Sequence, residues 1–531
     1  MRYSILLLLA FLGTLHAQTK VEQATKDKIL LLGNGTEPKN LDPQTVTGVT
    51  ENHIITALME GLIAYHPTDQ ALPESGLANK WESNTDASEW TFNIREGAKW
   101  SNGDPVKASD FLFAYQRILS PGLAAEYADQ LFIMVGAEDY QKGKITDFTK
   151  VGVKALDDLT LKISLVGPTP FFLSMLTHYS WFPVHPATIL KFGKIDDRVS
   201  LWTRPENYVG TGPFKLKEWK VNQLISVERN PNYWDANNVK LNGIEFYPID
   251  DQNTEERAFR AGQLHKTLEV PLDKIPAYRR DNPKTIRIDP YLGTYFYRFN
   301  VNIPALKDVR VRQALNLAID RESVVENITR GGQIPAKGFT PQGMGRYKTP
   351  ELINYDPDKA RELLAAAGYP GGKGFPKLSI LINTSESHKT IAEGIQQMWK
   401  EELGIDVGIR NEEWKVYLDS QSNLNYEISR SGWIGDYMDP ITFLTMWTTG
   451  NGNNDTGWTN KEYDALIAQA AREGDEAKRF DIMQRAETIL LNDPPFGLIY
   501  WYTRVYLKGP NLVNWNPLLL DNHNYKYIDL K

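Results

Sequence analysis

Residues 377–409 read KLSILINTSESHKTIAEGIQQMWKEELGIDVGI, and the order of patterns in this stretch decides the fold class. The first six residues form a short apolar run typical of a strand, and residues 405–409 form a second. Between them, apolar residues recur at helical spacing and a glycine follows: Ile391, Ile395, Met398, Trp399, Leu403 and Gly404. Strand, helix and strand at this spacing predict a βαβ unit with parallel pairing, and therefore an α/β fold.

Short apolar runs and helical patterns alternate along the rest of the chain as well. Residues 28–32 (KILLL) and 90–94 (WTFNI) predict strands, the second with the alternation of a half-buried strand. Residues 308–321 carry one apolar helical stripe. Asp356-Pro357 predicts a helix start and Gly368 its end. Repeats, low-complexity tracts and long linkers are absent from the sequence, which favours long discontinuous domains over a string of separate ones.

The composition excludes several classes of function. The 531 residues are 41% hydrophobic and 24% charged, as in ordinary soluble globular proteins, and the length predicts three or four structural units. A net charge of −7 disfavours general binding to nucleic acid. Because cysteine is absent, disulfides, thiolate metal sites, thiol catalysis and lipidation at a cysteine are excluded.

Residues 1–17 (MRYSILLLLAFLGTLHA) predict a cleaved export signal. Arg2 supplies the positive start, residues 5–12 form an apolar run, and Ala17 ends a plausible cleavage site. The run is shorter than the ~20 residues that span a bilayer. We therefore expect a soluble, periplasmic protein without a lipid anchor.

Signatures of catalysis and of metal binding do not emerge from the sequence. Walker, H-E-x-x-H and G-x-S-x-G motifs are missing. His178 and His185 are seven residues apart, which matches no metal spacing, and both are interpreted as structural or surface residues. We expect neither an enzyme nor a protein with a cofactor or bound metal.

Seven segments, taken in order, carry a resemblance to a known family. They are 37–43 (EPKNLDP), 90–111 (WTFNIREGAKWSNGDPVKASDF), 208–215 (YVGTGPFK), 227–235 (VERNPNYWD), 289–297 (DPYLGTYFY), 308–321 (DVRVRQALNLAIDR) and 431–440 (SGWIGDYMDP). Together they resemble the periplasmic oligopeptide-binding proteins of ABC importers, in family 5 of the bacterial extracellular solute-binding proteins. The resemblance covers nearly the whole chain after residue 17.

The resemblance implies a two-lobed α/β binding protein of type II, cluster C, with an additional inserted domain. Its boundaries, carried onto this chain, give lobe I as 18–60, 185–287 and 505–531. The inserted domain II is 61–184 and lobe III is 288–504. The ligand lies between lobes I and III, which close over it by a hinge.

Three charged or titratable residues match positions that the family uses for the ends of a peptide. Asp436 matches an aspartate that pairs with the α-ammonium. Arg430 matches an arginine that meets the carboxylate of short peptides, and its planar fork suits that group. His388 matches a histidine that serves the carboxylate of a longer peptide. Asp436 and Arg430 are at most ~20 Å apart along the chain, whereas a tripeptide spans roughly 10 Å, so one segment can reach both termini.

Other matching positions imply walls and main-chain contacts. Aromatic residues that match cleft-lining positions are Tyr127, Trp414, Trp433 and Tyr502, and for each a role in the core is nearly as well supported. Main-chain groups that match peptide-bonding positions belong to Val49, Gly432 and Ile434. Together with the contacts to the two ends of the peptide, these main-chain contacts imply that the peptide binds as an added strand, whose side chains occupy roomy, hydrated pockets.

This chain departs from the family pattern at three places. Thr47 stands where the family often has an acidic residue, and Ile434 stands where a cysteine can occur. A family lysine near 327–330 falls on Asn327 or Thr329, with Arg330 as a possible substitute. These departures leave the preferred peptide length open.

The function implied is a monomeric receptor that captures short peptides and delivers them to a membrane ABC permease. Relatives of the same architecture bind cell-wall peptides, oligosaccharides, haem or nickel complexes, and these ligands form the alternative. Aromatic residues suit sugars by stacking. A carboxylate together with an arginine favours a zwitterion instead.

Overall fold

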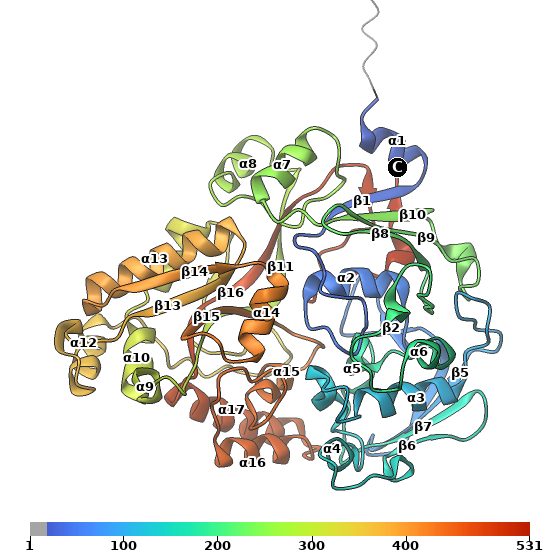
Figure 1. Ribbon diagram of the computed structural model, residues 1–531, viewed down its shortest axis with the longest axis horizontal. Helices are drawn as coiled ribbons and strands as arrows, with labels where there is room; N and C mark the ends of the chain where they lie inside the picture. Colours follow the sequence, from blue (N-terminus) through green and yellow to red (C-terminus); the bar gives the residue numbers. More distant parts are fainter. Residues whose placement is uncertain (1–17) are drawn as a thin grey trace, which may run out of the picture.

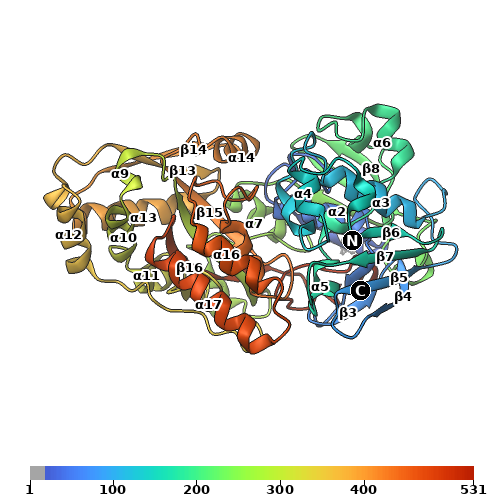
Figure 2. The same ribbon diagram turned by 90° about the horizontal axis from the view of Figure 1, so that it is seen from below.

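The computed structural model describes residues 18–531, so the predicted export signal lies outside the described residues. The chain folds into two halves that face each other, seen most clearly in the view from below (Figures 1 and 2). One half is built on a six-stranded sheet, and the other combines two four-stranded sheets. Within residues 18–531, no helix has both the length and the apolar character needed to cross a membrane.

The six-stranded sheet has the order β12-β16-β11-β15-β13-β14. Its strands are β11 (Ile286–Phe299), β12 (Ile334–Pro335), β13 (Leu378–Asn383), β14 (Val407–Glu412), β15 (Ile428–Ile434) and β16 (Phe496–Leu507). β13 and β14 pair in parallel through the helix α13 (Glu386–Leu403), which confirms the predicted βαβ unit. Gly404 ends that helix with φ +71°, a left-handed conformation that glycine adopts without strain.

The two four-stranded sheets lie in the other half. The first has the order β1-β10-β9-β8, from β1 (Ile29–Gly33), β8 (Phe214–Lys220), β9 (Leu224–Arg229) and β10 (Gly243–Tyr247). The second has the order β4-β5-β7-β6, from β4 (Ala78–Ser83), β5 (Glu89–Ile94), β6 (Val153–Ala155) and β7 (Thr160–Ser164). The strands predicted over 28–32 and 90–94 are present as β1 and β5, and β5 alternates between buried and partly exposed residues as expected. Paired two-stranded ribbons are β2 (Ile63–Tyr65) with β3 (Pro73–Ser75) and β17 (Leu512–Val513) with β18 (Asp529–Leu530).

The helices follow their sequence signals closely, with small differences at the ends. The Asp356 side chain caps α12 and Pro357 begins it, as predicted. The helix predicted over 308–321 ends earlier, at Leu317, because the chain turns there before Asp320 caps the next short helix. The α-helices of at least seven residues are α1 (Lys20–Lys26), α2 (Val49–Leu58), α3 (Ala108–Ile118), α6 (Pro186–Phe192), α7 (Gln252–Arg260), α8 (Ile275–Asp281), α10 (Val309–Leu317), α12 (Pro357–Ala366), α13, α14 (Trp414–Ser422), α16 (Lys461–Ala470) and α17 (Glu476–Asn492).

Two long strands, β11 and β16, run from one half of the molecule into the other (Figure 1). They pair antiparallel at both ends, but the register shifts between Pro290 and Thr294. The boundaries expected between lobes I and III, at 287/288 and 504/505, fall inside these strands. The irregular step interrupts the ladder shortly after these positions, and the domain boundaries stay a prediction.

Candidate functional site

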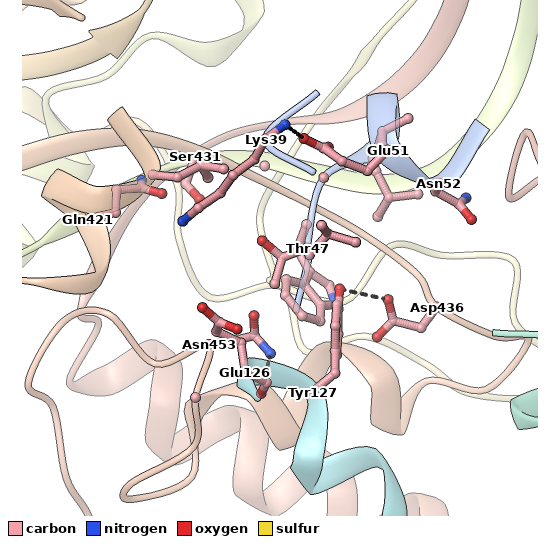
Figure 3. Close-up of a pocket in the computed structure, with 18 of the residues that line it drawn as sticks. Lys39, Thr47, Glu51, Asn52, Glu126, Tyr127, Gln421, Ser431, Asp436 and Asn453 are labelled. Atoms are coloured by element: carbon pink, nitrogen blue, oxygen red, sulfur yellow. Dashed lines mark hydrogen bonds between the residues drawn. The ribbon is translucent and has the colours of Figure 1, made fainter. Parts of the chain in front are cut away.

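Three adjoining cavities lie between the two halves. The Asp436 cavity holds about 1180 Å³ of empty space, partly open to solvent, and residues of 39–52, 126–127, 178–179 and 414–455 line it (Figure 3). The central cavity shares Gly48, Trp414 and Gly432 with it, and the distal cavity shares His388 and Tyr502 with the central one. The empty space in each of the first two exceeds 1000 Å³, a figure that includes solvent at their openings, and the shared residues join all three into one cleft.

β15 presents a free main-chain edge to the Asp436 and central cavities. Its pairing with β13 stops at Ser429, whereas its pairing with β11 continues to Ile434. The N–H of Gly435 donates to the carbonyl of Leu292 on β11 at 2.9 Å. Because antiparallel pairs alternate, the main-chain groups of Gly432 and Ile434 point away from β11, toward the cavities. The carbonyl of Arg430 points the same way and already accepts the hydroxyl of Tyr417.

Gly432 allows a close approach that a larger residue would prevent. A Cβ atom at this position would lie 2.6 Å from the hydroxyl oxygen of Tyr502. The absence of a side chain therefore lets Tyr502 pack beside the exposed edge of the strand.

The Asp436 carboxylate is buried where the half with the six-stranded sheet meets residues 126–131 of the other half. Its side chain is 6% exposed. It accepts hydrogen bonds from the Tyr127 hydroxyl at 3.2 Å, the Gln130 amide at 2.8 Å and the Thr442 hydroxyl at 3.2 Å. His178 Nε2 lies 3.5 Å away. Figure 3 shows Tyr127 reaching this carboxylate from the opposite wall.

When Asp436 is ionised, its charge has no counter-charge in the described part of the chain. It forms no ion pair there with a lysine or arginine, and its hydrogen-bond partners are neutral. Burial lowers the pKa of His178 to about 3, so this imidazole is also neutral. Burial, and after it the negative charge of Asp129, raises the pKa of Asp436 to about 8. A ligand cation at this carboxylate would relieve both effects.

Arg430 lines all three cavities and has no carboxylate partner within residues 18–531. Its Nη1 donates to Asn383 Oδ1 at 3.3 Å and its Nη2 to the Tyr502 hydroxyl at 3.1 Å. The guanidinium carbon lies 5.1 Å from the ring centre of Tyr295. Neutral partners thus hold the cation in place and leave its charge available to an anion.

His388 lies on α13 and lines the central and distal cavities. Its Nδ1 lies 3.2 Å from the Tyr295 hydroxyl. Burial, and then the charge of Arg430, lowers its pKa well below the ordinary value. The neutral imidazole can exchange a hydrogen bond with a ligand but cannot supply a counter-charge.

The four aromatic residues named from the sequence all contact the cavities. Trp414 stacks on Tyr417 with ring centres 5.6 Å apart and lines two cavities. Trp433 has both of its possible roles, because it belongs to the hydrophobic core and also lines the Asp436 cavity. Tyr127 lines the same cavity, and Tyr502 lines the other two.

Val49 is the first residue of α2 and lines the Asp436 and central cavities. An N–H in the first turn of a helix has no acceptor within that helix. Gly48, the N-cap, provides no side-chain cap. The N–H of Val49 thus lacks a helical partner at the wall opposite β15.

The sequence did not identify several residues that complete the site. Gln130 had no signal at all, and His178, interpreted as structural or surface, contacts Asp436. Glu51, four residues after Thr47, is fully buried and its Oε1 lies 3.3 Å from Trp414 Nε1, across the two halves. Arg330 is exposed and its Nε donates to the Asn327 carbonyl, whereas Thr329 lines the distal cavity.

Comparisons with known proteins agree with this arrangement. The family model of the bacterial extracellular solute-binding proteins, family 5, matches residues 73–455. The oligopeptide-binding protein OppA of Bacillus subtilis is 36% identical over 90% of this chain and 88% of its own. The complex of Haemophilus influenzae OppA with the peptide RPPGFSPFR superposes with a TM-score of 0.89 at 32% identity, covering 95% of this chain and 99% of that one.

Two structures of one relative indicate the state of the halves. The murein tripeptide-binding protein MppA of Escherichia coli superposes with a TM-score of 0.89 at 35% identity. Its unliganded open form reaches only 0.64 at 34% identity. Both comparisons cover 95% of this chain and 99% or 98% of the other. The two halves described here are therefore arranged unlike those of the open form.

Proposed function

Because the chain belongs to the bacterial extracellular solute-binding proteins of family 5, we propose that it is a receptor for short peptides, which it delivers to an ABC permease. The observation that carries this proposal is a free strand edge with an unpaired buried carboxylate at one end and an unpaired arginine farther along. A peptide has an extended backbone, a positive start and a negative end, which complement these three features.

The backbone of the peptide is held as an added strand. The main-chain groups of Gly432 and Ile434 face the cavity without a strand partner, and Val49, whose N–H has no acceptor within its helix, lines the cavity from the opposite wall. These contacts are the same for every peptide, whatever its sequence. The side chains occupy the wide cavities, where water can adapt its hydrogen bonds to each of them.

The two ends of the peptide are held by charge. Asp436 pairs with the α-ammonium, which is largely protonated at neutral pH because its pKa is ~7.7–8. Arg430 pairs with the carboxylate of a short peptide, and His388 donates to that of a longer one. Trp414, Trp433, Tyr127 and Tyr502 form the walls between these groups.

Closure of the halves is coupled to the arrival of the ligand. Side-chain contacts across the cleft include Lys39 Nζ with Asp419 at 2.8 Å and Ser387 Oγ with Gln252 at 2.7 Å. Closure of an empty site also buries the Asp436 carboxylate without a cation, which is unfavourable. A bound ammonium removes this penalty, so the ligand favours the closed form.

The receptor works outside the cytoplasm, as the periplasmic relatives do, and it acts as a monomer that releases its ligand unchanged. An oligosaccharide would leave both the carboxylate and the arginine without partners, so the arrangement favours a zwitterion.

The test is to purify the exported protein, denature it and identify released ligands by mass spectrometry. We expect short peptides of varied sequence with free termini. Calorimetry on the refolded protein should then detect binding of tri- and tetrapeptides, and their masses should be unchanged after incubation. Absence of both copurified and titrated peptides would refute the proposal, and cleaved products would indicate an enzyme.

A further inference from the structure

A second arginine faces the interlobe cavities, at a position that the sequence did not point to. Arg504 lies on β16, which runs between the two halves, and it is 8% exposed. Its side chain lines the central and distal cavities together with Arg430 and His388. It does not line the Asp436 cavity, so it lies beyond Arg430 as seen from that carboxylate.

The guanidinium of Arg504 is only partly used by the protein. Its Nε donates to Asp521 Oδ2 at 2.6 Å. Its Nη2 is buried without a hydrogen-bond partner, and within residues 18–531 we find no hydrogen bond from Nη1. Nη1 and Nη2, which together can bind a carboxylate by two parallel hydrogen bonds, therefore have no hydrogen-bond partner among the residues that the structure describes. A buried donor without a partner is costly, so an acceptor that reached Nη2 would be stabilising.

The charges around Arg504 leave room for an anion. Asp521, its partner, is also in contact with His523 at 2.9 Å. Glu269 lines the same cavities but forms no ion pair with Arg504, and the amide of Gln252 donates to its carboxylate. An anion would thus be repelled from the Glu269 side and held on the side where Arg504 and Arg430 face the cavities.

The spacing of Tyr502 and Arg504 along β16 gives the approximate separation of the two arginines. Tyr502 and Arg504 lie on the same face of β16, two residues apart, which corresponds to roughly 7 Å. Arg430 is hydrogen-bonded to Tyr502, and the guanidinium of Arg504 lies over the ring of Tyr291, whose centre is 5.8 Å from that of Tyr502. An extended peptide covers this distance with about two residues.

We propose that Arg504 is a second carboxylate anchor, which binds the C-terminus of peptides about two residues longer than those that end at Arg430. The inference rests on the proposed function. His388 faces the same cavities but is neutral, so a buried terminal carboxylate there needs a permanent cation. Arg504 supplies that cation, and peptide length decides which arginine is used.

The test compares alanine tripeptides and pentapeptides, each with a free or an amidated C-terminus, by calorimetry. In the unmodified protein, amidation should weaken both lengths roughly tenfold or more. In Arg504→Lys, which keeps a charge beside Asp521 but loses the fork, the free pentapeptide should weaken by a similar factor and its amidation penalty should shrink. The tripeptide should be unaffected. Arg312→Lys, a change at a buried arginine paired with Asp493 outside the cavities, is the matched control.

The outcomes separate the two proposals. If no peptide binds the unmodified protein, the proposed function fails. If tripeptides bind but amidation of the pentapeptide has no effect, or Arg504→Lys weakens both lengths equally, the second anchor is refuted. Should Arg504→Lys not fold, Arg504→Gln combined with Asp521→Asn removes both charges together, and the same comparison of lengths applies.

Discussion

Replacing Asp436 by asparagine should abolish recognition of the peptide α-ammonium while leaving the fold intact. Two unit charges ~3 Å apart attract by roughly 5 kcal/mol at an effective dielectric constant of 20. Breaking a buried ion pair costs about 3–5 kcal/mol. The amide of asparagine can still accept from Gln130 at the position now 2.8 Å away, so we expect the lower end, about 3 kcal/mol. That value corresponds to a loss of roughly 150-fold in affinity.

The assay is a double-mutant cycle in which the second change is made on the ligand. Calorimetry at pH 7 measures an alanine tripeptide and its N-acetylated form against the unmodified protein and Asp436→Asn. The free tripeptide on the unmodified protein should bind tightly, and the other three combinations should be weak by similar amounts. Their coupling energy should therefore be about 3 kcal/mol.

Stability provides the internal check for this variant. Because the buried carboxylate is uncompensated in the ligand-free protein, Asp436→Asn should not lower its melting temperature. Glu487→Gln is the matched control: this carboxyl is also buried in lobe III, and burial raises its pKa to about 7, but it lines none of the three cavities. A coupling energy below about 0.5 kcal/mol would refute the assignment of Asp436 to the ammonium.

Three further outcomes follow from the same geometry. Burial in the arrangement described here raises the pKa of Asp436 from its ordinary 3.8 to about 8, and we expect the ordinary value in an open, hydrated cleft, so protons should favour the closed form. The closed fraction should be highest below pH 4 and should fall as the pH rises toward 8. The slope is at most ~1.4 kcal/mol per pH unit, read by small-angle scattering, and a flat profile would contradict it. Gly432→Ala places a Cβ 2.6 Å from the Tyr502 hydroxyl and should weaken all peptides about tenfold or more without unfolding the protein; unchanged calorimetric affinity would argue against the strand edge. Arg430→Met should weaken free tripeptides by roughly 2–5 kcal/mol and amidated ones far less, and an equal loss for both would remove this arginine from the carboxylate site.

Local features of the fold were predictable because short-range physics determines them. The βαβ unit over 377–412 was predicted from its hydrophobic periodicity and from Gly404. Both signals depend on residues that are close together in the sequence. The same holds for the cap at Asp356 and the alternation in β5. The end of the helix after Leu317 was misplaced because its stripe continues into Ala318 and Ile319, which are buried although the helix has ended.

The candidate residues came from ordered motifs rather than from any single pattern. Asp436 and Arg430 stood out only because whole segments around them resembled a family. The structure then assigned their partners, which the sequence could not: Gln130, which donates to Asp436, is 306 residues away. No periodicity links residues so far apart.

What the sequence alone determined is the α/β class, many element boundaries and the chemical types of the groups at the ends of the site. Only the tertiary structure decided that segment 61–184 contributes neutral donors to Asp436, that β15 ends its pairing early, and that Arg504 lines the cleft with Nη2 left without a partner in residues 18–531. The physical reason is that burial and uncompensated charge depend on which distant segments meet, and chain folding alone brings them together.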